Sequence, residues 1–196
     1  MQYEMTPQEL LDEVKRYKNF IRSGGVTCTG GEPLMQPDFL IEFLRLCKEA
    51  GFHTALDTSG VIFSDKSREA IDLADLVLLD IKTLDDDLHP AYVGQPRANN
   101  QATLEYLQQT AKPTWIRHVV VPGYTDRDDR LSALAQHVAR YSVVERVEIL
   151  PYHTMGSFKY KELGLENPLE GVPPLSAERR DNAKEIFRRY LTCPVV

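Results

Sequence analysis

The sequence predicts an α/β fold in which five strands alternate with helices as parallel βαβ units. Short apolar runs with the length of buried strands recur along the chain, and segments with helical periodicity separate them. These helices have about ten or more residues, which leaves enough chain for the crossover between parallel strands. Polar residues follow each apolar run. We therefore expect a functional rim at the carboxyl ends of the strands, where barrels and open parallel sheets both bind ligands.

Capping residues and glycines delimit the predicted elements. A capping box places the first helix, with Thr6 as N-cap, Pro7 at the first helical position and Glu9 reaching back. The elements expected in order are a helix to about Ile21, a strand over 26–29 ending in Gly30 and Gly31, a helix stopped by Gly51, a strand with its polar loop over 53–60, a helix over 65–74, a strand over 76–82, a helix over 100–111, a strand over 115–123, a helix over 129–141, a strand over 146–153 and a helix from Ser176 to about Leu191.

Length and composition predict one domain over residues 1–196, without linkers or repeats. A net charge of −6 argues against a nucleic-acid partner, because broad binding to phosphates needs clustered Lys and Arg. No apolar run approaches the length of a membrane span, so no membrane partner is expected. The three cysteines are far apart, which indicates neither a disulfide framework nor a zinc site and favours the cytoplasm.

The stretch "GGVTCTGGEP" at 24–33 raises the first functional question. Gly30 and Gly31, directly after a strand, would let the backbone approach a ligand, but an isolated glycine pair is a weak signal and is more often a plain turn. The stretch matches neither the Walker phosphate loop nor the dinucleotide-binding glycine motif. Cys28 is expected to be a small core residue because it lies within a predicted buried strand, and without a basic partner close in sequence it is not expected to be a nucleophile.

Charged residues follow or interrupt the other strands. Asp57 with Thr58 and Asp80 end neighbouring strands, where they could bind a cation, act as an acid and a base, or simply cap the next element. Lys82 follows Asp80 on the same predicted strand face, and a single histidine, His153, ends the last strand. Strand alternation places Arg117 on one face with Trp115 and Val119, opposite Ile116 and His118; a ligand or a structural salt bridge would satisfy its charge.

Taken together, five segments resemble the pyruvate formate-lyase activating enzymes, which are radical S-adenosylmethionine proteins. The resemblance runs from the first helix to the C-terminus and rests on "GGVTCTGGEPLMQPDF", "CKEAGFHTALDTSG", "LVLLDIK", "WIRHVVVPGYTD" and "ILPYHTMGSFKYKELGLENPLEGV". It implies a partial TIM-type (β/α)6 barrel with S-adenosylmethionine bound across the strand ends. It also implies a [4Fe-4S] cluster that passes an electron to the cofactor, so that the resulting 5′-deoxyadenosyl radical removes hydrogen from a glycine of the partner enzyme.

The resemblance also implies roles for individual residues. Gly30, Gly31 and Glu32 match the motif that receives the methionine amino group of S-adenosylmethionine. Other cofactor-binding positions are implied at Asp80, Ile81, Lys82 and His153. The family's monovalent-cation site matches Asp57, Thr58 and Asp80. The partners implied are pyruvate formate-lyase or another glycyl-radical enzyme, with flavodoxin or ferredoxin as electron donor.

The cluster ligands are the main departure from the family pattern. The family carries three cysteines as C-x3-C-x2-C on the first strand, whereas Cys28 is the only cysteine before Gly30 in this chain. We therefore expect an N-terminally truncated barrel that lacks its first strand, has no resolvable catalytic residue and is inactive by itself. Two alternatives stay open: a non-catalytic module that binds S-adenosylmethionine or a partner, and an unrelated barrel enzyme with Asp57 and Asp80 as acid and base.

Overall fold

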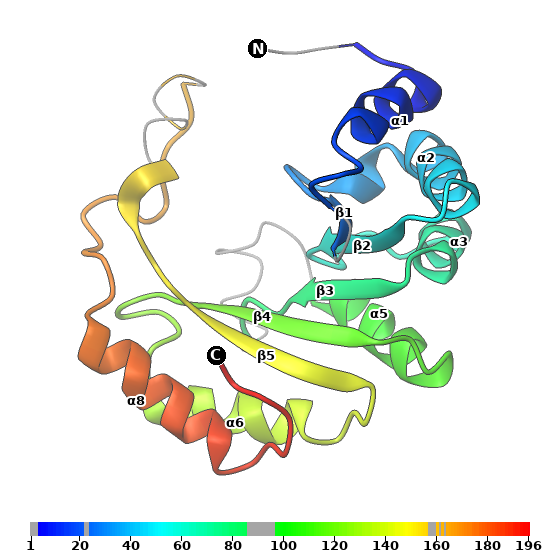
Figure 1. The fold of residues 1–196 in the computed structure, drawn as a ribbon. Coiled ribbons are helices and arrows are strands. Elements are labelled where there is room, and N and C mark those ends of the chain that lie inside the picture. The colour runs from blue at the N-terminus through cyan, green and yellow to red at the C-terminus, as the bar shows by residue number, and fades with distance from the viewer. Residues whose placement is uncertain (1–3, 22–23, 86–96, 157–159, 161, 163) are drawn as a thin grey trace. The chain divides into compact units, whose positions relative to one another are not determined.

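Five strands are hydrogen-bonded in sequence order, which confirms the predicted α/β class: β1 (Gly25–Cys28), β2 (His53–Thr58), β3 (Leu76–Asp80), β4 (Thr114–Val120) and β5 (Val144–Pro151), labelled in Figure 1. The structure is a computed structural model that describes residues 4–21, 24–85, 97–156, 160, 162 and 164–196. It divides into two compact units, Met1–Asp80 with Ala98–Trp115, and Ile81–Arg97 with Ile116–Val196. A single domain over 1–196 stays a prediction. None of the helices within the described ranges is long and apolar enough to cross a membrane.

The first unit holds three parallel strands and the helices next to them. β1 pairs with β2 and β2 with β3, and the last registered pairs are Cys28 with Leu56 and Thr58 with Leu79. Its elements are α1 (Pro7–Arg16), β1 (Gly25–Cys28), the 3-10 helix η1 (Pro33–Met35), α2 (Pro37–Glu49), β2 (His53–Thr58), α3 (Asp65–Leu73), β3 (Leu76–Asp80) and α5 (Ala98–Gln109). The parallel register brings the carboxyl ends of the strands to one edge.

The predicted caps of the first unit are confirmed, but its first helix is shorter than expected. Thr6 and Glu9 form the capping box. The helix ends at Arg16 rather than Ile21, because the amides of Tyr17, Lys18 and Phe20 bond to carbonyls three residues back, as in a 3-10 turn. Gly51 takes a positive φ of 76° directly after Ala50, the C-cap of α2, as the predicted stop requires.

Apolar residues from α1, from α2 and from the position just before β2 form one core cluster of the first unit. Leu11, Phe43, Cys47 and Phe52 are buried there, and half-buried Val26 and Cys28 of β1 pack against them. Cys28 is therefore packed against the core, as predicted, but at its border rather than inside it.

The second unit contains most of β4 (Thr114–Val120), α6 (Asp128–Val138), β5 (Val144–Pro151), the 3-10 helix η2 (Thr154–Gly156) and α8 (Ala177–Arg188). Figure 1 shows α6 and α8 side by side next to β5. Ser176 caps α8 as predicted. The C-terminal residues pair with β5: the amides of Val147 and Ile149 donate to the carbonyls of Pro194 and Val196 at 2.9 Å. This pairing continues the sheet hydrogen bonds beyond β5.

Candidate functional site

The glycine loop after β1 leaves room for a ligand to reach the backbone. Gly30 and Gly31 have φ values of 90° and 55°, a region that L-residues with a side chain seldom adopt. A Cβ built on either residue meets no atom within 4 Å, so the loop faces open space. The loop geometry fits a ligand that approaches the main chain, as the amino-group prediction requires, and the role itself stays a prediction.

Glu32 fastens the end of β2 to the glycine loop. Its Oε1 accepts hydrogen bonds from the Thr58 hydroxyl at 2.7 Å and the Leu34 amide at 3.2 Å. Its Oε2 accepts from the Ser59 amide at 2.9 Å and the Ser59 hydroxyl at 2.5 Å. The carboxylate is also the N-cap of η1. Glu32 therefore has a local structural role besides the predicted binding of an ammonium group.

Asp57 and Asp80 lie on the same face of the sheet at its carboxyl edge. Asp57 is in register with Leu78, and Asp80 follows Leu78 by two residues, so strand alternation turns all three to one face. All three are half-buried. The Thr29 hydroxyl donates to Asp57 Oδ2 at 2.8 Å, which ties β2 to the residue after β1. Two carboxylates on one face form an oxygen-rich environment that suits a cation.

Thr58 does not share that face with its side chain. It pairs with Leu79, both residues are buried, and its hydroxyl donates to Glu32 and accepts from the Gly60 amide at 3.0 Å. Any contribution of Thr58 to a cation site would therefore come from its backbone carbonyl. No group of three His, Cys, Asp or Glu side chains in the described part of the chain could hold a metal ion.

Three predicted residues belong to the second unit. β3 ends at Asp80, so Ile81 and Lys82 lie beyond the strand rather than within it, where the apolar pattern had placed them. Ile81 is buried, and its amide donates to the carbonyl of Arg117 at 3.0 Å. His153 is exposed after β5, next to Tyr152, whose amide donates to Val120 at 3.1 Å. Their cofactor-binding roles stay predictions.

Arg117 has an acidic partner in its own unit. Its Nε lies 3.6 Å from Glu148 Oε2, and the two side chains are 26% and 22% exposed. The predicted alternation along β4 is confirmed, since Ile116 and His118 are buried whereas Arg117 is half-buried. The sequence left a ligand or a structural salt bridge as the partner of the Arg117 charge, and the structure shows the salt bridge.

The three cysteines present do not fit an iron–sulfur cluster. Burial raises the pKa of Cys28 to about 12 and that of Cys47 to about 11, and it also raises the pKa of Cys193. A cluster is held by several converging thiolates, and among the residues that the structure describes no group of three His, Cys, Asp or Glu side chains converges in that way. Cys47 is buried in α2, and Cys193 belongs to the other unit.

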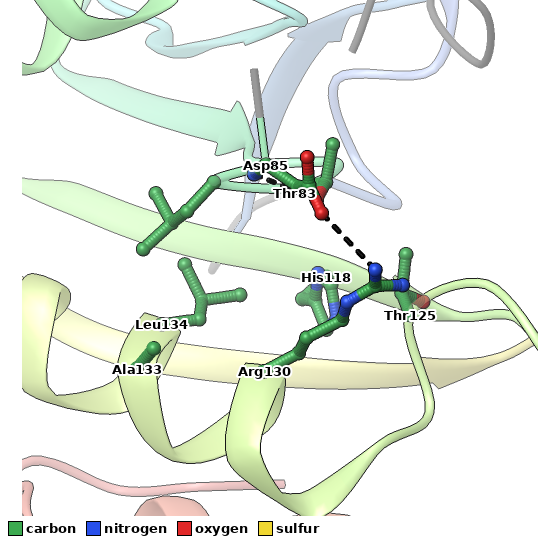
Figure 2. Close-up of a pocket in the computed structure, with 8 residues that line it drawn as sticks. Thr83, Asp85, His118, Thr125, Arg130, Ala133 and Leu134 are labelled. Atoms are coloured by element: carbon green, nitrogen blue, oxygen red, sulfur yellow. Dashed lines mark hydrogen bonds and ion pairs between the residues drawn. The ribbon is translucent and has the colours of Figure 1, made fainter. Parts of the chain in front are cut away.

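The sequence did not predict a cavity of about 240 Å³ in the second unit, shown in Figure 2. Arg130 Nη2 lies 3.0 Å from Asp85 Oδ2 at this cavity, and the Asp85 amide donates to the Thr83 hydroxyl. Buried His118 lines the cavity, and its Nδ1 lies 2.8 Å from the Ile81 carbonyl. None of the predicted site residues lines it. Asp85 and Arg130 are 45 residues apart, so no local sequence pattern could predict this ion pair.

Comparison with known proteins places the chain among radical enzymes. Residues 1–135 match the model of the radical SAM superfamily. The pyruvate formate-lyase-activating enzyme of Streptococcus mutans is 45% identical over 94% of this chain and 73% of its own. That of Clostridium pasteurianum is 40% identical over 96% and 79%. The pyruvate formate-lyase 1-activating enzyme of Escherichia coli K12 is 38% identical over 95% and 78%.

Solved structures show the same fold. A domain of a pyruvate-formate lyase-activating enzyme from Bacteroides vulgatus matches with a TM-score of 0.73 at 24% identity, covering 89% of this chain and 99% of that domain. Streptococcus suis SuiB bound to S-adenosylmethionine matches with a TM-score of 0.72 at 14% identity, covering 100% of this chain and 44% of SuiB. These likenesses agree with a partial TIM-like barrel.

Proposed function

The chain belongs to the radical SAM superfamily and, within it, to the pyruvate formate-lyase-activating enzymes, and from this we propose that it binds S-adenosylmethionine at the carboxyl ends of β1, β2 and β3. The observation that carries the proposal is the open glycine loop, in which Gly30 and Gly31 present their backbone to free space beside the carboxylate of Glu32. Carbonyl and carboxylate oxygens there suit the ammonium of the methionine end.

We propose further that the protein generates a glycyl radical on pyruvate formate-lyase, the target that the relatives' names state. When bound, S-adenosylmethionine would supply the hydrogen-abstracting chemistry, and the residues of this chain would bind and orient it. Asp57 and Asp80, on one face, would hold a monovalent cation beside the methionine carboxylate and so offset its negative charge. No step is assigned to the [4Fe-4S] cluster, because the three thiols of this chain do not fit it.

Three finer points are proposals from the family alone: flavodoxin or ferredoxin as electron donor, the cytoplasm as location, and another glycyl-radical enzyme as an alternative target. The proposal of a non-catalytic binding module has less support, since the relatives similar over nearly the whole chain are named as activating enzymes. The proposed cation site already accounts for the carboxylates of Asp57 and Asp80, so an unrelated barrel enzyme that uses them as acid and base has less support.

Calorimetric titration of the chain with S-adenosylmethionine tests the binding proposal. We expect saturable binding that Asp57→Ala and Asp80→Ala weaken, with Glu42→Ala on the exposed face of α2 as a control that does not. Absence of binding to the unsubstituted, folded chain would refute it. The radical activity is tested by the electron paramagnetic resonance signal of a glycyl radical on pyruvate formate-lyase, and absence of that signal would refute the activity.

A further inference from the structure

One buried amide joins the ends of two strands in the first unit. Asn100 lies in the first turn of α5 and is 5% exposed. Its Nδ2 donates to the carbonyl of Ser59 at 2.7 Å and to the carbonyl of Asp80 at 2.9 Å. The register of β2 and β3 ends at Thr58 and Leu79, so both carbonyls lie one residue beyond the last pair. The side chain thus links the strands where their register stops.

Two neighbouring side chains of α5 hold the next carbonyls of the same loop. The Thr103 hydroxyl shares its single proton between the carbonyl of Gly60 at 3.1 Å and that of Asn99 at 2.9 Å, and Asn99 Nδ2 donates to the carbonyl of Val61 at 2.8 Å. The loop packs tightly against β3 at Gly60, since a Cβ on that residue would lie 2.8 Å from Leu79 Cδ1. Three consecutive carbonyls, at positions 59 to 61, therefore accept hydrogen bonds from side chains of α5.

The contacts of Asn100 lead directly to the proposed cofactor site. The Ser59 carbonyl accepts a hydrogen bond from Asn100. The amide and the hydroxyl of the same residue donate to the Glu32 carboxylate. Asp80, the other residue held, carries one of the two carboxylates that share a face at the strand ends. Loss of the Asn100 amide would leave two partly buried carbonyls without this donor, which frees both loops to move.

We infer that Asn100 is a positioning residue for the methionine end of the S-adenosylmethionine site, acting through the carbonyls of Ser59 and Asp80. The inference rests on the proposed function. Asn100 touches no reacting atom; it sets the spacing between the loop that secures Glu32 and the end of β3 that carries Asp80. Preorganisation of this kind lowers the cost of ordering a site when ligand binds.

Calorimetry on the full chain tests the inference with Asn100→Ala and Asn100→Asp, the second of which keeps the size of the side chain but has no donor. Both should weaken S-adenosylmethionine binding by at least about tenfold, equivalent to about 1.4 kcal/mol. Glu105→Ala removes an exposed side chain of the same helix, one that accepts a hydrogen bond from Gln101 at 2.8 Å and does not contact residues 59–61, and serves as the control, with an expected change below about threefold. Unchanged affinity in both Asn100 variants would overturn the inference.

A second ligand separates positioning from general damage to the fold. 5′-Methylthioadenosine has the adenosyl group of S-adenosylmethionine but no amino acid, so its affinity should be unchanged in the Asn100 variants. Equal losses for both ligands would show a merely structural role and overturn the inference. Amide hydrogen exchange should also become faster at Ser59 and Gly60 in Asn100→Ala, and unchanged exchange there would contradict the mechanism.

The outcomes separate this inference from the proposed function. Failure of the unsubstituted chain to bind S-adenosylmethionine would refute the proposed function and this inference with it. Normal binding by the unsubstituted chain together with normal binding by both Asn100 variants would refute the inference alone.

Discussion

Replacing Glu32 with Gln tests whether this carboxylate organises the strand ends. Each carboxylate oxygen accepts from one hydroxyl and one backbone amide, of Thr58 and Leu34 at Oε1 and of Ser59 at Oε2. The NH₂ group of a Gln would face one of these pairs in either orientation. A hydroxyl can rotate and accept instead, but a backbone N–H cannot, so one amide loses its acceptor outright.

The expected cost follows from that count. A hydrogen bond to a charged group contributes about 1.5–3 kcal/mol, and the remaining bonds weaken when the charge is removed. We expect Glu32→Gln to destabilise the chain by at least about 2 kcal/mol, which lowers Tm by about 4–8 °C in a protein of this size. Thermal unfolding followed by far-ultraviolet circular dichroism measures the difference.

Glu42→Gln is the matched control for the change in charge. Glu42 is 49% exposed on α2 and pairs across one helical turn with Arg45, so its substitution should change Tm by about 1–2 °C or less. If Glu32→Gln lowers Tm no more than Glu42→Gln does, the four hydrogen bonds do not stabilise the loop and the structural role assigned to Glu32 is wrong.

Four further predictions concern a glycine, the thiols and an ion pair. Gly60→Ala should destabilise by more than about 1 kcal/mol relative to Gly51→Ala in urea unfolding, because both glycines have positive φ but only Gly60 has a close neighbour; equal costs would contradict this. The thiols of Cys28 and Cys47 should react slowly with a disulfide reagent in the native chain at pH 8 and rapidly in urea. Because their native pKa values of about 12 and 11 exceed the unfolded value of about 8.5, stability should fall as pH rises above about 8.5, and the Cys28→Ser, Cys47→Ser double variant should reduce that fall. The hydrogen bond from Arg179 lowers the pKa of Asp128, so Arg179→Gln should raise it in an NMR titration, while an unmoved pKa would show that the contact is absent in solution.

Local signals in the sequence predicted the elements, and their limits are also local. The capping box at Thr6 and the cap at Ser176 placed two helix starts correctly, because each is made by residues three apart. The end of the first helix was set too late, since the turns after Arg16 keep helix-like spacing while changing the hydrogen bonds. Helix and strand periodicity do not report that change.

The site was only partly predictable for a different reason. The resemblance pointed to Glu32 and Asp80, but neither periodicity nor motif indicated that Ser59 and Asn100 would join them. Those contacts span 27 residues between Glu32 and Ser59 and 41 between Ser59 and Asn100. Contacts at that separation depend on how strands and crossover helices pack, and a single sequence contains no period that reports them.

The hydrogen bonds from side chains of α5 to the carbonyls of residues 59–61 have a consequence for protein design. Asn99, Asn100 and Thr103 are weaker helix formers than Ala or Leu, and an engineer who optimised α5 for helix propensity would replace all three. The redesigned helix would gain intrinsic stability but lose the three side-chain donors that hold the loop after β2. A repacked variant could therefore melt at a higher temperature and still be the poorer starting scaffold, so libraries on this chain should hold these three positions constant.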